Sequence, residues 1–293
     1  MKKKIWKDLI FTDKTELSAI QKSLNIPKSI TTAISDNEEL SYLRSYNNSV
    51  QYIVLNIPVY DDSIEKTPFI TYHVLPIVLI MKKESIMFLH NSKIDITKFC
   101  QTINSTSPKE IFSAFVLFLL KQYEQTMRIW QNNLHIIEPL LLKTPSNKHI
   151  EAAHTLHKST ILYQPAIIGI ETVIQTIIDN KLELIWNDNL KEYYFDMMIE
   201  CKQIEKMVIV NSEIITSLVN TSSSVLSNNL SQTMQTLTVI TIIISIPTLI
   251  TGFYGMNINL PFQNSPNALM IVTVITLIIT ILTSIYLYLK KLF

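Results

Sequence analysis

The sequence predicts an α/β N-terminal cytoplasmic domain, a long helical stalk and two C-terminal transmembrane helices. Three observations lead to this fold class. The first hundred residues carry β-rich runs, the residues from about 108 onward follow the helical period, and no charged residue occurs between Glu213 and Lys290. Only 17% of the 293 residues are charged, against about 25% in soluble domains, and the uncharged stretch accounts for this deficit.

The N-terminal region combines strands with short helices. Its β-rich runs cover residues 50–59, 69–81 and 85–89. Asp13 or Thr15 is expected to cap a short helix, and a second helix is expected over residues 36–44. Three lysines follow Met1, but no apolar segment comes after them, so the start is not typical of a signal peptide and we expect this domain to stay in the cytoplasm.

Three long helices are expected after this region. Pro108 suits the first turn of a helix that extends to about residue 142. A second helix covers about residues 148–180, and a third begins near Asn187 and meets neither proline nor glycine until Pro247. A helix of about sixty residues is about 90 Å long. We therefore expect one rod to extend from the cytoplasm into the bilayer.

Two apolar stretches, residues 237–253 and 268–289, have the length of about 20 residues that crosses a membrane. Lys290 and Lys291 follow the second stretch, so the positive-inside rule places both termini in the cytoplasm and the chain in the cell membrane as a multi-pass protein. The expected divisions are a cytoplasmic α/β domain at 1–107, a helical stalk at 108–233, transmembrane helix 1 at 234–256, an extracellular loop at 257–267, transmembrane helix 2 at 268–289 and a basic tail at 290–293.

A polar stripe follows the third helix into the first apolar stretch. Its members recur in steps of three and four: Asn220, Ser224, Ser227, Ser231, Met234, Thr238, Thr241, Ser245, Thr248 and Gly252. This heptad spacing keeps one face inward in a left-handed bundle. It fits a water-lined pore, or a packing face at which small residues let helices approach closely. The stripe begins before the membrane stretch, which favours a pore, and a pore needs a cyclic homo-oligomer.

A short motif ends the first apolar stretch. The chain continues from that stretch as Gly252-Phe253-Tyr254-Gly255-Met256-Asn257, after an upstream Ile246-Pro247-Thr248. With two C-terminal spans and a basic tail, this arrangement resembles the CorA family of magnesium channels over nearly the whole chain. The resemblance implies a homopentameric funnel, a selectivity filter at Gly255, Met256 and Asn257, and passive transport of Mg²⁺.

The same resemblance implies regulation by intracellular divalent cation. Asp196 follows Tyr193-Tyr194-Phe195 and is similar to the family's acid in a regulatory Mg²⁺ site between subunits; a solvated helix residue is the other interpretation. Its partner acid stays open among Asp61, Asp62, Glu84 and Asp95. The chain departs from the family pattern at Asn220, where aspartate is usual, at Ser231, where asparagine is usual, and in the uncharged outer loop.

Other kinds of function have little support in the sequence. No nucleophile motif, phosphate loop or covalently bound cofactor is expected, so we expect no enzyme. A net charge of +1 gives no reason to expect a nucleic-acid partner. His154 and His157 have a metal-compatible spacing but no further local ligand except Glu151. The expected partners are membrane lipid, divalent cation and further copies of the chain. Zinc, cobalt or nickel transport, or a membrane-anchored sensor or scaffold, are the alternatives.

Overall fold

The computed structural model describes residues 5–46, 49–60, 72–105, 107–183, 185–258, 260–262 and 266–290. The chain divides into two compact units, Met1–Thr221 and Ser222–Phe293. The helices are α1 (Lys14–Leu24), α2 (Lys28–Ala33), α3 (Thr97–Thr102), α4 (Pro108–Lys143), α5 (Asn147–Asn180), α6 (Lys191–Tyr254) and α7 (Ala268–Leu289), with a short 3₁₀ helix, η1 (Asp188–Leu190), before α6. Helix α6 contributes residues to both units.

The first unit contains a five-stranded mixed sheet. Its strands are β1 (Trp6–Phe11), β2 (Tyr42–Tyr46), β3 (Val50–Tyr60), β4 (Tyr72–Lys82) and β5 (Ser85–Asn91), in the order β1-β5-β4-β3-β2. Strand β1 pairs with β5 in parallel, and the other pairs are antiparallel. The three β-rich runs of the sequence are confirmed as β3, β4 and β5, although residues 69–71 lie outside the described part of the chain.

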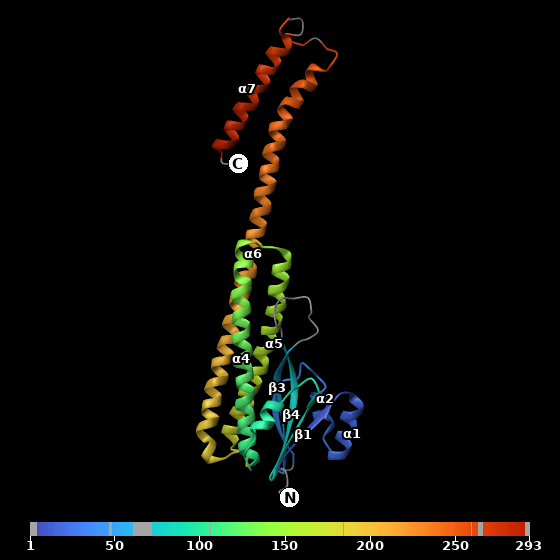
Figure 1. The fold of residues 1–293 in the computed structure, drawn as a ribbon, viewed down its shortest axis with the longest axis vertical. Helices are drawn as coiled ribbons and strands as arrows, with labels where there is room; N and C mark the ends of the chain where they lie inside the picture. The colour runs from blue at the N-terminus through green and yellow to red at the C-terminus, as the bar shows by residue number, and fades with distance from the viewer. Residues whose placement is uncertain are drawn as a thin grey trace. The chain divides into compact units, whose positions relative to one another are not determined.

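Side chains alternate between the two faces of this sheet, as the period of two in a strand requires. Leu55 and Phe88 belong to the core on the face covered by the long helices, whereas Val54 and Leu89 belong to a second core with α1 and α2. Figure 1 shows α1 and α2 on one side of the sheet and α4 and α5 on the other. Because both faces of the sheet are covered, the central strands have continuous apolar sequences.

Local sequence explains where several helices begin. The Asp13 carboxylate accepts hydrogen bonds from the backbone amides of Thr15 and Glu16 at the start of α1, and Ser146 caps α5 in the same way. Pro108 occupies the first turn of α4, as predicted. The helix expected over residues 36–44 is wrong. That segment contains turns and then enters β2, because Tyr42 to Tyr46 complete the sheet edge beside β3.

Aromatic side chains join the sheet to the helical layer. The Tyr123 hydroxyl of α4 donates to the Asn56 carbonyl of β3 at 2.8 Å, and Trp130 stacks on Tyr163 of α5 with ring centroids 4.7 Å apart. Burial raises the pKa of both tyrosines well above the ordinary value. These phenols therefore stay neutral, and Tyr123 acts as a hydrogen-bond donor that fixes α4 against the sheet.

Three helices among the described residues are long and apolar enough to cross a membrane: Asn147–Asn180, Asp188–Tyr254 and Ala268–Leu289. They differ in burial. In the most apolar window of α5, 44% of the residues are buried, against 6% and 0% in the other two. Its buried side chains, such as Leu156 and Ile170, belong to the core of the first unit. Core packing therefore explains the apolar character of α5. In the other two helices, the apolar side chains of these windows are not buried.

We predict that Gly169→Ala destabilises the first unit. A Cβ added at Gly169 of α5 would lie 2.9 Å from the Ser41 Cβ and 3.0 Å from the Ser41 backbone nitrogen. Overpacking of this kind costs about 1–3 kcal/mol, more than the roughly 1 kcal/mol that alanine gains in helix propensity. The thermal unfolding midpoint should fall. Thr172→Ala on the exposed side of α5 is the control. An equal rise in the unfolding midpoints of Gly169→Ala and Thr172→Ala would contradict the prediction.

Candidate functional site

All ten residues of the polar stripe lie on the exposed side of α6. The described chain leaves every one of them exposed, from Asn220 to Gly252. The opposite side of the helix is the covered one, since Val239 is only 2% exposed and Ile243, Ile246 and Ile250 are partly buried. The stripe is therefore a continuous polar face that a single copy of the chain leaves open.

Four hydroxyl groups of this face already donate hydrogen bonds within α6. The side chains of Thr238, Thr241, Ser245 and Thr248 each donate to the backbone carbonyl four residues earlier, at 2.7–2.9 Å. A hydroxyl has one proton and two lone pairs, so each oxygen still offers acceptor capacity. The face presents a series of neutral, weak oxygen ligands, a chemistry that suits cations and water.

Pro247 interrupts the series of backbone hydrogen bonds in α6 beside this face. It lies inside α6, which continues to Tyr254, and a proline has no backbone N–H to donate. The Thr251 hydroxyl donates to the carbonyls of Pro247 and Thr248 at 2.9 and 3.1 Å. Four stripe residues, together with apolar neighbours, line an open groove of about 810 Å³ here: Thr241, Ser245, Thr248 and Gly252.

The predicted filter residues form the turn in which α6 ends. The Gly255 amide donates to the Thr251 and Gly252 carbonyls at 3.0 and 3.2 Å, and the Met256 amide donates to the Phe253 carbonyl at 3.1 Å. Gly255 has no positive φ. Tightened helical hydrogen bonds therefore end α6 at this turn without a positive φ at the glycine.

Tyr254 contributes a contact that the sequence did not predict. Its hydroxyl donates to the Pro261 carbonyl at 2.9 Å, which ties the end of α6 to the loop that follows the motif. Met256 and Asn257 stay exposed between the two partners. The hydrogen bond thus closes a small loop around the predicted filter, and only a tyrosine or another long donor at position 254 can make it.

Asp196 lies in a hollow of about 300 Å³ between α4 and α6, together with Glu124 and Glu200. Burial, followed by the negative charges of Glu124 and Asp196, raises the pKa of Glu200. Arg128 pairs with Glu124 at 2.8 Å and offsets part of this charge. Sequence reasoning identified Asp196 but missed the other two acids. Glu200 lies four residues further along the same helix, on the same face, whereas Glu124 joins them only because α4 packs beside α6.

The partner acid of Asp196 is not assigned within one chain. Asp61 and Asp62 lie outside the described residues, Glu84 is exposed in the turn between β4 and β5, and Asp95 accepts a hydrogen bond from the Thr97 amide at the start of α3. In the described parts of the chain, no three histidine, cysteine or acidic side chains could together hold a metal ion. Any ion in the hollow needs water or a second copy to complete its ligands.

The His154 and His157 pair has an ordinary structural role. The His157 Nε2 lies 3.0 Å from the Ser212 hydroxyl and 3.4 Å from the Thr216 hydroxyl, both on α6. Burial and the neighbouring His154 lower the pKa of His157. The side chain therefore joins α5 to α6 as a neutral hydrogen-bonding group.

Comparison with known proteins gives consistent results. The family model described as CorA-like Mg²⁺ transporter protein matches residues 2–291. The chain is 23% identical over 278 residues to the cobalt/magnesium transport protein CorA of Methanocaldococcus jannaschii, covering 92% of this chain and 84% of that one. The complete structure of the CorA magnesium transporter from the same organism has a TM-score of 0.78 at 21% identity, covering 97% and 89%. Full-length CmaX has a TM-score of 0.71 at 11% identity, covering 95% and 88%.

We predict that Tyr254→Phe loosens the motif turn. Loss of the hydrogen bond to Pro261 removes about 0.5–1.5 kcal/mol, so amide exchange at residues 255–258 should become about twofold to twelvefold faster. Hydrogen exchange of the detergent-solubilised protein measures this change. Tyr288→Phe is the matched control, since Tyr288 is exposed and no hydrogen bond of its hydroxyl is found within the described residues. Unchanged exchange in Tyr254→Phe would mean that the contact does not hold the turn.

Proposed function

This chain belongs to the CorA-like Mg²⁺ transporter family, and we propose that it is a passive magnesium channel gated by intracellular divalent cation. Members of the family are ion transporters and not enzymes. The observation that carries the proposal is the exposed stripe of α6, in which the hydroxyl groups of Thr238, Thr241, Ser245 and Thr248 donate within the helix and keep acceptor capacity on their oxygens. Such a face is costly in lipid and useful around a water-filled axis.

The pathway requires several copies of the chain. One helix cannot enclose a pore, and a cyclic assembly brings the same face of each copy to one axis. We propose a homopentamer embedded in membrane lipid, with both termini in the cytoplasm, α6 crossing as the pore-lining helix and α7 as the outer helix. The exposed apolar side chains of α7, such as Leu269 and Leu282, suit contact with lipid.

The chemistry of the path favours magnesium as the substrate. Mg²⁺ gives up its water slowly and prefers oxygen ligands, and a neutral ring of Asn257 side chains offers hydrogen bonds to a hydrated ion without binding it tightly. Softer metals would favour sulfur or imidazole ligands, of which the stripe and the filter have only Met234 and Met256. The relative from Methanocaldococcus jannaschii is described as a cobalt/magnesium transport protein, so cobalt is the first competitor, ahead of zinc and nickel.

The driving force in this proposal is the ion gradient and the membrane potential. Each elementary charge moved through 100 mV is worth about 2.3 kcal/mol, so a divalent ion gains about twice that amount on entering a negative cytoplasm. Without a gate, Mg²⁺ would continue to enter until the gradient and the membrane potential no longer favoured entry. A regulatory site on the cytoplasmic side is therefore physically reasonable.

The hollow at Asp196 is our candidate for that gate. Its carboxylates supply the hard oxygen ligands that Mg²⁺ prefers. Burial, and then the negative charges of Glu124 and Asp196, raise the pKa of Glu200, and a bound cation would relieve this negative charge. We propose that Mg²⁺ binds there with further ligands from water or a neighbouring copy and favours the closed state. This is feedback through different ion affinities of two states.

We predict that Thr241→Leu and Ser245→Leu block transport. Either change replaces an oxygen ligand by a bulky apolar group in every copy of the stripe, and flux of Mg²⁺ into proteoliposomes should fall at least about tenfold, which corresponds to a barrier higher by about 1.4 kcal/mol. Ile243→Leu is the control and should be tolerated, because Ile243 is partly buried on the side of α6 away from the stripe.

The same flux assay discriminates the alternatives. Magnesium, cobalt, zinc and nickel should be compared at equal gradients. Zinc flux that needs no magnesium and exceeds magnesium flux would favour the zinc alternative. A scaffold without transport predicts no flux in wild-type protein of native oligomeric size. Equal loss of flux in Ile243→Leu and Thr241→Leu would contradict the assignment of the pathway to the stripe.

We predict that Asp196→Asn and Glu200→Gln weaken inhibition by cytoplasmic Mg²⁺. The inhibitory concentration should rise about tenfold, which equals a loss of about 1.4 kcal/mol in binding free energy, while flux at zero cytoplasmic Mg²⁺ stays near the wild-type value. Because protons compete for a carboxylate of raised pKa, inhibition of the wild type should weaken as pH falls. Glu192→Gln, an exposed acid of α6 outside the hollow, should behave as wild type. Unaltered inhibition in both hollow variants would refute this site.

A further inference from the structure

A pocket of about 570 Å³ lies at the end of the sheet, beside the turn that joins α1 to α2. The sheet residues that line it, such as Tyr52, Ile80 and Met87, belong to the face that packs on α1 and α2 (Figure 1). The turn contributes Asn25 and Lys28. This volume lies within the range of about 300–1,000 Å³ that is usual for small-molecule sites.

The charged side chains that line this pocket are both positive. Lys28 is the first residue of α2 and Lys82 is the last residue of β4, and no acidic residue is found among the described lining residues. In the described part of the chain neither lysine has an ion pair, although Lys82 is partly buried. Ammonium groups that have lost part of their water and lack a carboxylate partner favour an anionic ligand.

Tyr52 adds a hydroxyl group without a partner in the chain. Its side chain is only 6% exposed and lines the pocket, and its hydroxyl makes no hydrogen bond with the residues that the structure describes. Burial, and then the neighbouring Tyr46, raises the pKa of Tyr52, so the hydroxyl keeps its proton. Because buried polar groups are normally paired, an acceptor oxygen in the pocket would complete the bonding of this donor.

Contacts within the chain fix one wall of the pocket before any ligand binds. The Tyr46 and Tyr52 rings meet edge to face, with centroids 5.5 Å apart and an interplanar angle of 88°. The Tyr46 hydroxyl lies 3.4 Å from Ser29 Oγ, which accepts from Arg44 Nη1 at 3.4 Å. Arg44 thus brings a third positive charge close to this wall. A wall that is already ordered reduces the entropy lost on binding.

The chemistry of the lining selects a class of ligand. A phosphate monoester carries a charge of about −1.5 to −2 at pH 7 and three acceptor oxygens, which matches two lysines and a tyrosine donor. The pocket is much larger than a phosphate ion, and buried apolar side chains contribute the rest of its surface: Ile26, Ile80 and Met87. These side chains suit the flat, largely apolar base of a nucleotide.

We propose that the pocket binds a nucleoside monophosphate, with the phosphate beside Lys28 and Lys82 and the base against the apolar side chains. Such a site is separate from the hollow at Asp196, because α1 and α2 cover the opposite face of the sheet from the long helices. Binding of the nucleotide does not depend on the proposed transport activity.

Isothermal titration calorimetry on the full chain in detergent tests the proposal. The probes are AMP, GMP, CMP and UMP, their nucleosides and inorganic phosphate, in buffer without divalent cations. At least one nucleotide should bind saturably with one site per chain, and its nucleoside and inorganic phosphate should each bind at least about tenfold more weakly. No saturable binding of any nucleotide, or equally tight binding of inorganic phosphate or the nucleoside, would overturn the proposal.

Variants place the binding in this pocket. Lys28→Gln and Lys82→Gln should each weaken nucleotide binding at least about tenfold, because each removes a hydrogen bond to a charged group. Their unfolding midpoints should stay near the wild-type value, since neither lysine has an ion pair within the described residues. Lys83→Gln, an exposed lysine outside the pocket, is the matched control.

Tyr52→Phe tests the unpaired hydroxyl. Loss of one donor to the phosphate should weaken nucleotide binding about threefold or more, with little change for the nucleoside. Nucleotide binding that is unchanged in both lysine variants, or that is lost equally in Lys83→Gln, would overturn the proposal. The lysine variants decide the outcome if Tyr52→Phe does not fold.

Discussion

The constraint on which the structure depends is that α6 must satisfy its backbone in two different solvents. It is continuous from Lys191 to Tyr254, and only a helix can keep its polar backbone groups bonded within one segment inside a membrane. Near its start, Tyr194 and Cys201 belong to the core of the first unit. Further along, the same helix has almost no buried side chains. One continuous helix therefore serves a water-soluble core and an apolar span.

The polar stripe follows from the same constraint. A serine or threonine in an apolar span cannot leave its hydroxyl proton without a partner, and each hydroxyl here finds one at the carbonyl four residues earlier. This hydrogen-bonding pattern keeps the helix intact and leaves lone pairs on the hydroxyl oxygens that can accept. Weak and repeated acceptors allow an ion to enter and also to leave. The acids at Asp196, Glu124 and Glu200 are the opposite case, since concentrated charge suits binding and not passage.

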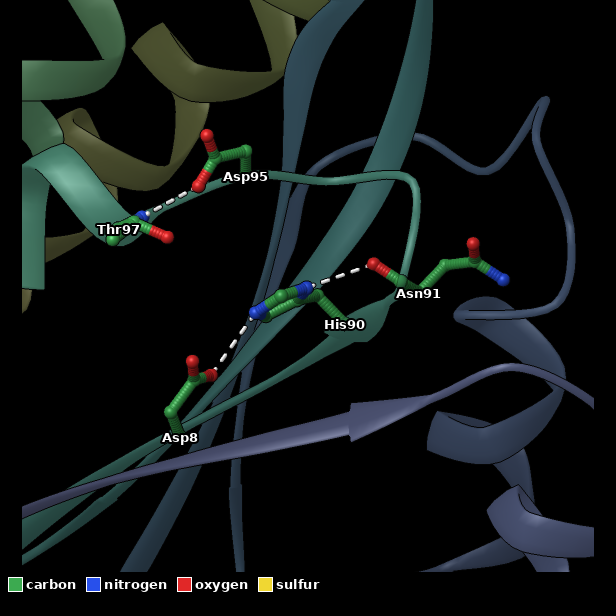
Figure 2. Close-up of polar contacts among 5 residues, drawn as sticks. All are labelled: Asp8, His90, Asn91, Asp95 and Thr97. Carbon is green, nitrogen blue, oxygen red and sulfur yellow. Dashed lines mark hydrogen bonds and ion pairs between the residues drawn. The ribbon is translucent and has the colours of Figure 1, made fainter.

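The first unit is held together by polar and aromatic contacts between its elements. Burial raises the pKa of the Tyr123 phenol well above its ordinary value, so its contact with the sheet does not respond to pH. Trp130 stacks on Tyr163 in the same core. Asp8 and His90 join β1 to β5, with the His90 Nε2 lying 3.0 Å from an Asp8 carboxylate oxygen (Figure 2).

The sequence by itself determined the elements that depend on local pattern. The β-rich runs, the start of α4 at Pro108, the length of α7 and the exposed stripe from Asn220 to Gly252 all follow from periodicity, capping and the absence of charge. These signals act over a few residues, so one chain is enough to read them. The family resemblance also rested on one short motif, from Gly252 to Asn257, in a recognisable place.

Only the tertiary structure decided the features that join distant segments. Strand β2 replaced the helix expected over residues 36–44, because pairing with β3 outweighs local preference. The apolar helix α5 was placed in a core, Glu124 was brought beside Asp196, and Asp8 was set against His90. Each of these contacts joins residues from separate elements, or depends on burial that packing alone creates, and no local pattern in the sequence encodes it.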